Sequence, residues 1–306
     1  MAPSIETTHL VDSAIPLDLA LSDKDFAELA HIVEVHIGIK MPPSKKPMVA
    51  SRLLRRLHQL TLSSYREYCK YIRTPVGWQT EERHFADLVT THKTEFFRES
   101  KHISYLAQRA LPQLIGSARG QQTLSVWSAA CSTGEEVYTL AMVLEDYRLR
   151  ATQTRFDFIV LGTDISEFCL ETARHAVYSE GSANDIPVHL RSQFLLRGTG
   201  GHENLIRITP ELRAHTQFRQ LNFMVEPWSI RGQFEVIFCR NVLIYFDAER
   251  QHRIISGLCD HLKEDGMLFL GHAETANLAM LPLMALGHTV YQKIKPTHNT
   301  VQRSDP

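Results

Sequence analysis

The sequence predicts an α/β protein that carries a small all-helical region at its N-terminal end. Three observations support this. Apolar residues recur at helical spacing between about residues 20 and 90. A short β-prone run, Leu124–Trp127, passes through a turn of small residues into another helical pattern. Beyond it, apolar runs such as Phe156–Asp164 alternate with helical patterns, which is typical of a parallel sheet covered by helices.

The composition is that of an ordinary globular protein. The 306-residue chain has 43% hydrophobic and 22% charged residues, and its length predicts roughly two domains. Its formal net charge of −1 gives no overall field that would select nucleic acid or a membrane surface. Five cysteines, an odd number without C-x-x-C spacing, indicate a reduced cytoplasmic chain. Glu6 and Asp12 stand where a signal peptide would be apolar, and no apolar run approaches the ~20 residues of a membrane span.

Caps and turns divide the helical region. Ser22–Asp25 resembles a capping box, and the helix that follows ends at the Met41–Pro43 turn. A second helix places four apolar residues on its buried side: Val49, Leu53, Leu57 and Leu60. A linker at about Tyr71–Val76 then leads to a third helix, from about Gln79 to Val89.

The second helix and its approach are basic. Between Val35 and Arg66 there are seven Lys or Arg and no Asp or Glu. The seven are Lys40, Lys45, Lys46, Arg52, Arg55, Arg56 and Arg66. A solvated helix face and a docking surface for an acidic partner explain this excess equally well. Nucleic acid is disfavoured, because no interleaved aromatic residues or recognisable binding motif accompany the charges.

Two strand ends indicate a nucleoside site. The small residues that follow Trp127 let the backbone approach a ligand at the carboxyl end of the first strand, although a plain strand–helix turn would look similar. Asp164 ends the second strand and is placed to accept hydrogen bonds from a ribose. This geometry serves adenine dinucleotides and S-adenosylmethionine (SAM) alike, so it indicates the nucleoside and leaves the chemistry open.

Three further segments carry polar groups or an exposed strand. Phe234–Phe246 predicts a buried strand with Arg240, Asn241 and Tyr245 just past its end. In Thr90–Glu99, Arg98 offers a planar fork suited to a carboxylate, or else forms a surface ion pair. Phe194–Ile208 predicts a hairpin around a Gly-rich turn, inserted into the α/β pattern. The exposed edge of this hairpin could pair with an extended peptide as an added strand. Spacing alone slightly favours a hairpin that binds no peptide.

Five motifs occur in order and at sensible spacing along the chain. They are Thr94-Glu-Phe-Phe-Arg-Glu99, Ala130-Cys-Ser-Thr-Gly-Glu-Glu136, Thr163-Asp-Ile165, Phe238-Cys-Arg-Asn-Val-Leu-Ile-Tyr-Phe246 and Gly271-His-Ala-Glu274. Together they resemble the chemotaxis receptor methyltransferases, the CheR family, over about residues 20–295. The resemblance implies methyl transfer from SAM to glutamate side chains of chemoreceptors, which gives glutamate methyl esters and S-adenosylhomocysteine.

The same resemblance implies the domain organisation. A helical N-terminal domain at 20–90 precedes a class I SAM-dependent, Rossmann-like methyltransferase domain at 91–295. An antiparallel β-subdomain is inserted at about 178–215, and a disordered tail follows at 296–306. The implied partners are the cytoplasmic helical region of the receptors and, through the β-subdomain, their C-terminal pentapeptide. A monomer is the default expectation.

The resemblance also assigns residues. Those implied around the cofactor are His92, Thr94, Arg98, Glu135, Asp164, Leu221, Asn222, Arg240 and Asn241. Arg98 and Tyr245 are implied nearest the transferred methyl group. The implied receptor-docking residues are Arg52, Arg55 and Arg56, and those of the peptide-tether loop are Gly198, Gly200 and Gly201. His92 stands where the family often has Asn, and an imidazole can replace one amide hydrogen bond but not both.

The implied chemistry needs few catalytic groups. A substrate glutamate has a reference pKa of about 4.3 and is therefore anionic at neutral pH, so neither a general base nor a metal is expected. Two other classes of protein are alternatives. An NAD-dependent oxidoreductase would carry G-x-G-x-x-G after the first strand, which residues 129–134 do not supply. A non-catalytic receptor adaptor that binds SAM or S-adenosylhomocysteine would lose Arg98 and Tyr245, which are both present.

Overall fold

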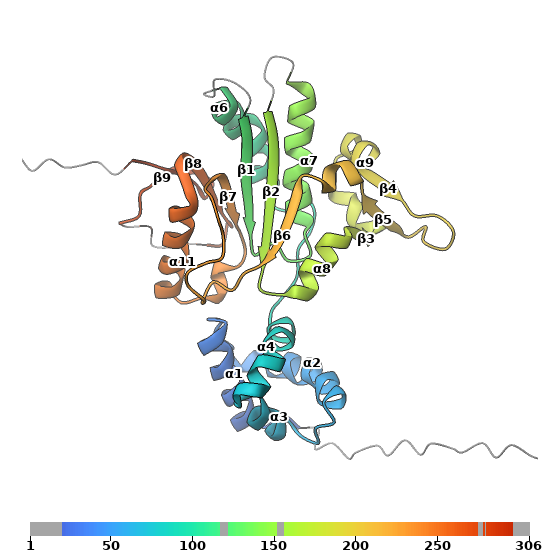
Figure 1. The fold of residues 1–306 in the computed structure, drawn as a ribbon, viewed down its shortest axis with the longest axis vertical. Helices are drawn as coiled ribbons and strands as arrows, with labels where there is room; N and C mark the ends of the chain where they lie inside the picture. The colour runs from blue at the N-terminus through green and yellow to red at the C-terminus, as the bar shows by residue number, and fades with distance from the viewer. Residues whose placement is uncertain (1–19, 117–121, 152–155, 275–277, 279, 296–306) are drawn as a thin grey trace, which may run out of the picture.

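The computed structural model describes residues 20–116, 122–151, 156–274, 278 and 280–295. A group of helices near the N-terminus stands apart from an α/β body (Figure 1). The predicted tail at 296–306 lies outside the described residues. Within the described ranges, no helix combines the length and the apolar character needed to cross a bilayer.

Four helices form the N-terminal group around a core of their own. They are α1 (Asp23–His36), α2 (Lys46–Gln59), α3 (Tyr65–Ile72) and α4 (Pro75–Val89). The predicted cap is confirmed, since the Ser22 side chain accepts a hydrogen bond from the Asp25 N–H at 3.0 Å. α3 was not predicted from the sequence, and α4 begins at Pro75 and not at the predicted Gln79. Thr74 caps α4 and Pro75 occupies its first turn, so the predicted linker is only the break between two helices.

The α/β body is built on a seven-stranded sheet in the order β6-β2-β1-β7-β8-β10-β9. Its strands are β1 (Gln122–Ala129), β2 (Phe156–Asp164), β6 (Thr216–Gln220), β7 (Phe234–Cys239), β8 (Leu262–Leu270), β9 (Leu283–Gly287) and β10 (Val290–Lys293). The five strands from β6 to β8 are parallel, and β10 pairs antiparallel with β8. Because β1 lies between β2 and β7, the carboxyl ends of these three strands meet at the middle of one edge of the sheet.

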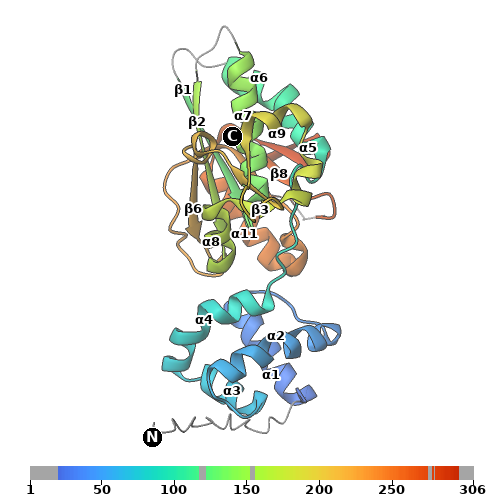
Figure 2. The same ribbon diagram turned by 90° about the vertical axis from the view of Figure 1, so that its right-hand side faces the viewer.

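Helices cover both faces of this sheet (Figures 1 and 2). The main ones are α7 (Glu135–Arg150), α8 (Glu167–His175) and α11 (Ala248–His261). A helical segment also precedes β1, comprising α5 (Ser100–Tyr105), a π-helical turn (Leu106–Ala110) and α6 (Leu111–Gly116). One apolar cluster packs α7 against the sheet and a second packs α11 against it. All five cysteines are described, buried and free of disulfides.

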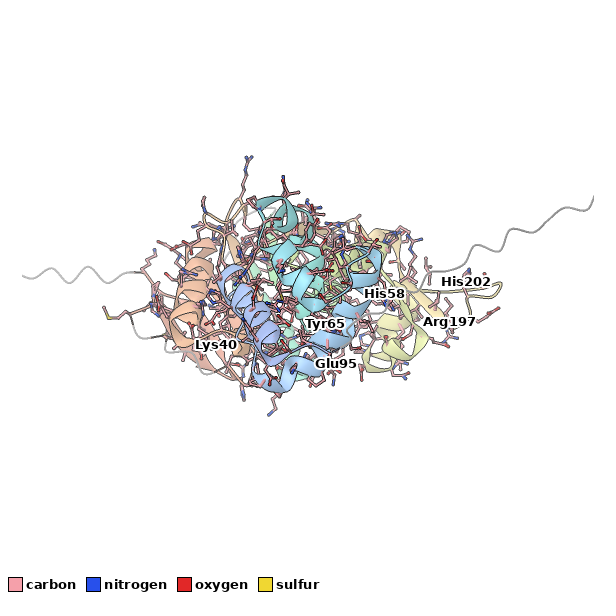
Figure 3. The ribbon with its side chains drawn as sticks, turned by 90° about the horizontal axis from the view of Figure 1, so that it is seen from below. Lys40, His58, Tyr65, Glu95, Arg197 and His202 are labelled. Atoms are coloured by element: carbon pink, nitrogen blue, oxygen red, sulfur yellow. The ribbon has the colours of Figure 1, made fainter. Side chains whose placement is uncertain are left out.

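The predicted hairpin is confirmed. β4 (Leu195–Arg197) pairs antiparallel with β5 (Leu205–Ile208), and β3 (Val177–Ser179) adds to the other side of β5. Two short helices flank this small sheet, α9 (Val188–Phe194) and α10 (Pro210–Arg213). The β4–β5 loop projects away from the rest of the molecule, with Arg197 at its β4 end and His202 within it (Figure 3).

The helical group contacts the α/β body through the segment that follows α1. Asn222 Nδ2 donates to the His36 carbonyl at 2.9 Å, and the Lys40 N–H donates to the Tyr245 carbonyl at 3.3 Å. Between these contacts, Gly38 has φ +81°, and a Cβ there would collide with the Met224 side chain. Glycine is therefore required both by the left-handed backbone and by the close approach of the two parts.

Replacing Gly38 with Ala should weaken the junction between the two parts. The added methyl group meets side chains of the α/β body at a strained φ, so we expect a loss of about 1–3 kcal/mol in the free energy of unfolding. Urea denaturation would measure it. Gly181→Ala is the matched control, because a Cβ at Gly181 meets no atom within 4 Å. Equal stability of the two variants would contradict this role of Gly38.

Candidate functional site

A cleft lies where the carboxyl edge of the sheet faces the helical group, with about 1150 Å³ of open space. The ends of β1, β2 and β7 line it on one side, and residues 37–41 and 89–94 line it on the other. Most of the residues predicted around a cofactor line this cleft: His92, Thr94, Arg98, Asp164, Leu221, Asn222, Arg240 and Asn241. Tyr245 also lines it. The structure thus brings residues from four separate stretches of the chain to one place.

The turn after β1 has the unusual backbone that a close ligand approach requires. Ala130, Ser132 and Gly134 all have positive φ, at 65°, 52° and 94°. At Gly134 a Cβ would lie 2.7 Å from the Cβ of Ala173, so this glycine also lets α7 begin against α8. The tight turn leaves the main chain of Ala130–Ser132 beside the cleft.

Asp164 is fixed by the backbone of that turn. Its Oδ2 accepts from the Ser132 N–H at 2.8 Å, and its Oδ1 accepts from the Ser166 N–H at 2.9 Å. Burial raises the pKa of Asp164, while these two hydrogen bonds act to lower it. A carboxylate has about four acceptor positions, so the two that remain can receive the hydroxyl groups of a ribose.

The two neighbouring glutamates at the start of α7 point to different places. Glu135 is not among the residues that line the cleft, and its Oε2 accepts from the Thr133 hydroxyl at 2.6 Å. Glu136 lines the cleft and accepts from Ser128 at 2.7 Å and from Arg240 Nε at 2.8 Å. Successive residues of a helix are about 100° apart, so only one of the pair can face the ligand. Glu136 therefore lines the cleft, whereas the predicted Glu135 does not.

Arg240 lies at the floor of the cleft, with a side chain that is only 2% exposed. Its guanidinium bonds to Glu136, to the Arg98 carbonyl at 2.8 Å and to Glu99 Oε2 at 3.3 Å. Asn241 Nδ2 donates to the other oxygen of Glu99 at 3.0 Å. Two carboxylates therefore neutralise one buried cation and set its orientation.

Glu99 is a second residue that the sequence analysis did not single out. It adopts a left-handed backbone with φ 53°, which aims its carboxylate at Arg240 and Asn241. Burial would raise the pKa of Glu99. The hydrogen bonds from His102 and Asn241 and the charge of Arg240 outweigh it and hold the pKa at about 2. The carboxylate is therefore ionised throughout the physiological range.

Glu99, His102 and His272 form the one group of possible metal ligands found among the described residues. His102 is fully buried, its Nδ1 lies 3.2 Å from Glu99, and its Nε2 contacts the His288 carbonyl at 2.6 Å. The Arg240 guanidinium also lies against Glu99. A metal cation here would have to compete with these contacts and with the positive charge of Arg240.

Arg98 and Tyr245 both line the cleft. Arg98 Nη1 donates to the Lys93 carbonyl at 3.1 Å, and no carboxylate pairs with Arg98 within the described residues. The alternative of a surface ion pair is therefore not observed. Tyr245 ends a short 3₁₀ turn whose start is held by Glu274, since Oε1 of Glu274 accepts from the Val242 and Leu243 N–H groups at 2.8 Å each. The predicted Gly271–Glu274 motif thus fixes the segment that carries Tyr245.

The mouth of the cleft is positively charged. Lys40, Lys45, Lys93 and Arg98 line it, and none of the four forms an ion pair within the part of the chain that the structure describes. Lys40 is exposed beside the helical group (Figure 3). The acidic residues that line the cleft, Glu136 and Asp164, already accept hydrogen bonds deeper inside. An anionic group would be attracted to this mouth.

The predicted docking arginines have different environments. Arg52 donates to the Leu88 and Thr90 carbonyls at 2.9 and 2.7 Å, at the end of α4. Arg56 forms a two-bond ion pair with the fully buried Glu81, at 2.9 and 2.6 Å. Arg55 is the exposed member of the three. Arg52 and Arg56 therefore hold α2 and α4 together, and only Arg55 presents its charge freely.

The predicted tether loop lies between β4 and β5. Gly200 and Gly201 have positive φ, at 60° and 93°, and a Cβ at either would meet no atom within 4 Å. At Gly198, by contrast, a Cβ would collide with the His202 carbonyl. The loop is exposed, so it is available to a partner, but no feature of the described loop identifies one.

Comparison with known proteins gives a consistent result. The model of the "CheR methyltransferase, SAM binding domain" matches residues 92–286, and that of the "CheR methyltransferase, all-alpha domain" matches residues 24–90. The chain is 37% identical to "Chemotaxis protein methyltransferase 2" of Pseudomonas aeruginosa, over 88% of this chain and 92% of that protein. It is 36% identical to "Chemotaxis protein methyltransferase" of Escherichia coli, over 89% of this chain and 92% of that protein.

Replacing Glu99 with Gln should destabilise the fold in a pH-dependent way. Because the folded pKa of about 2 lies below the unfolded value of about 4.5, ionised Glu99 contributes stability that is fully present above pH 4.5 and is lost as pH falls toward 2. We expect a loss of about 3 kcal/mol at pH 7, and a smaller difference from the wild type at pH 3–4. Urea denaturation at several pH values would measure this.

The neighbouring Glu95→Gln is the matched control for that experiment. Glu95 is exposed and labelled in Figure 3, so its replacement should change stability by no more than about 0.5 kcal/mol. A difference between wild type and Glu99→Gln that stays constant from pH 7 to pH 3 would show that the Glu99 charge is not the stabilising feature.

Proposed function

The chain belongs to the CheR methyltransferase family and is a SAM-dependent methyltransferase that acts in chemotaxis, and we propose that its substrates are glutamate side chains of chemoreceptors. The products would be glutamate methyl esters and S-adenosylhomocysteine. The observation that supports this most strongly is the charge of the cleft mouth, where four cations form no ion pair among the described residues at the entrance to the proposed SAM site. A substrate carboxylate is the group that such an entrance attracts.

The cleft fits SAM. The ribose hydroxyl groups would bind the two free acceptor positions of Asp164, and Leu221 and Asn222 would lie along the nucleoside. The ammonium group of the amino-acid end needs an acceptor, and Glu136 is the carboxylate that faces the cleft near Arg240. We assign this contact to Glu136, which replaces Glu135 in the proposed set. His92, Thr94, Arg98, Arg240 and Asn241 complete that set.

His92 can make one of the two hydrogen bonds that an Asn would offer. Its Nε2 lies 3.1 Å from the Asp87 carbonyl, which only accepts, so Nε2 carries the proton. Nδ1 is then left as an acceptor in the neutral ring. His92 would therefore accept a hydrogen bond from the ligand and would donate none.

The chemistry requires orientation more than proton transfer. Bound SAM supplies an electrophilic methyl group, and the substrate carboxylate, with a reference pKa of about 4.3, is already a nucleophilic anion at neutral pH. Arg98 would pair with this carboxylate and aim one oxygen at the methyl group, while the Tyr245 hydroxyl would support the same geometry. Alignment of this kind can contribute roughly 7–11 kcal/mol to the lowering of a barrier.

Neither competing class is favoured. The relatives are methyltransferases, which argues against an NAD-dependent oxidoreductase. A non-catalytic adaptor would not need reactive groups in the cleft, yet Arg98 and Tyr245 both line it.

The partners follow from the same assignment. The acidic, helical methylation region of a receptor would meet the exposed Arg55 and the cations at the cleft mouth, in the cytoplasm. The β4–β5 edge and its loop, with Gly198, Gly200 and Gly201, would take the receptor's C-terminal pentapeptide as an added strand. The protein would act as a monomer without a catalytic metal.

Glu136→Gln should weaken the binding of S-adenosylhomocysteine, whereas Glu135→Gln should leave it nearly unchanged. Loss of a charge-assisted hydrogen bond costs about 1.5–3 kcal/mol, which is roughly 10- to 150-fold in affinity. Isothermal titration calorimetry measures this directly, with NAD as a negative control ligand. If Glu135→Gln weakens binding and Glu136→Gln does not, Glu135 is the residue that contacts the cofactor.

Transfer of a tritiated methyl group from SAM to receptor-containing membranes tests the function itself. We expect incorporation that base releases as methanol, as from an ester. Arg98→Ala should lower kcat on the order of 100-fold through loss of alignment, and Arg109→Ala, at an exposed position outside the cleft and the basic helix, serves as the control. If the wild-type protein binds S-adenosylhomocysteine but transfers no methyl group, the non-catalytic adaptor is favoured. If Arg98→Ala keeps the full kcat, the proposed role of Arg98 is wrong.

A further inference from the structure

A second polar hollow lies beside β6, the edge strand of the large sheet, and shares no residue with the cleft. It is bounded by the start of α7, the end of α8, the end of α10 and β6 itself. The residues that define it are Tyr138, Arg174, Arg213, Thr216, Phe218 and Arg219. No acidic residue lines it, and three of its side chains are guanidinium groups.

The three arginines are not equally neutralised. Arg174 pairs with Glu167 at 2.6 Å. No ion pair or side-chain hydrogen bond is formed by Arg213 or Arg219 among the described residues, and Arg219 is exposed. The Nε of Arg213 is buried from solvent and has no hydrogen-bond partner there. Buried donors are satisfied in nearly all native proteins, so the guanidinium of Arg213 keeps hydrogen-bonding capacity that the described residues leave unused.

The two hydroxyl groups that line the hollow do not accept a hydrogen bond from Arg213 Nε. The Tyr138 hydroxyl donates to the Ala173 carbonyl at 2.7 Å, and the Thr216 hydroxyl donates to the Arg213 carbonyl at 2.9 Å. Solvated surface arginines are common, but they do not bury an unpartnered Nε beside two further guanidinium groups. The rings of Tyr138 and Phe218, with centroids 5.9 Å apart, give the hollow an apolar side.

We propose that this hollow binds a phosphate group, either as inorganic phosphate or as part of a small phosphate ester. The two Nη groups of Arg213, which have no partner among the described residues and are not buried, match two phosphate oxygens, and the third oxygen would face Arg174 or Arg219. The aromatic side would accommodate the organic part of an ester. β6 continues directly into Leu221 and Asn222 of the cleft, so an occupant would contact the strand that leads to it.

Isothermal titration calorimetry on the full chain tests this with inorganic phosphate and with phenyl phosphate. We expect saturable binding of at least one of them that Arg213→Gln weakens by about tenfold or more. Arg253→Gln, which removes an exposed charge from α11, should change the affinity less than twofold. Tighter binding of phenyl phosphate would identify an ester as the ligand, and tighter or equal binding of inorganic phosphate would identify the free anion.

Two results would overturn the proposal. One is the absence of saturable binding of either anion. The other is binding that Arg213→Gln leaves unchanged but Arg98→Gln abolishes, which would place the anion at the mouth of the cleft. Circular dichroism checks that Arg213→Gln folds. If it does not fold, Arg219→Gln decides instead, because Arg219 is exposed and its loss should weaken binding without unfolding the chain.

Discussion

The guanidinium of Arg240, held between Glu136 and Glu99, is the interaction on which the site depends. It joins the start of α7, the segment that carries Arg98 and the end of β7 at one buried point. Removing one member of a buried pair leaves an uncompensated charge and typically costs 3–5 kcal/mol. The floor of the cleft is therefore fixed before any ligand arrives, which is what alignment of reacting groups requires.

Charge is separated along the depth of the cleft. At the floor, carboxylates are neutralised by Arg240 or by backbone N–H groups, as Asp164 is. At the mouth, cations have no acidic partners within the described residues. A cofactor with a cationic end and a substrate with an anionic end would each meet the charge that complements it. The methyl donor would therefore lie at the floor of the cleft, and the proposed carboxylate acceptor would lie at its mouth.

The helical group contributes to the cleft and also carries the residues proposed for docking. Residues 37–41 line it, and Gly38 lets them approach the α/β body closely. The ion pair between Arg56 and the buried Glu81 fixes α2 against α4, while Arg55 stays exposed. A receptor that docks on the helical group would therefore be presented to a mouth that the same group helps to form.

The sequence by itself determined the fold class and most of the cleft, because these depend on local patterns. Apolar runs and small-residue turns predicted β1, β2 and the hairpin, and parallel strands place their carboxyl ends, with Asp164 and Arg240, at one edge. Only the tertiary structure decided the rest. Arg240 meets Glu136 across 104 positions, and Arg56 meets Glu81 across 25, so no local pattern distinguishes Glu136 from Glu135 or a docking arginine from a paired one. Such choices depend on which side chains are brought together by packing, because a buried charge is stable only beside its partner.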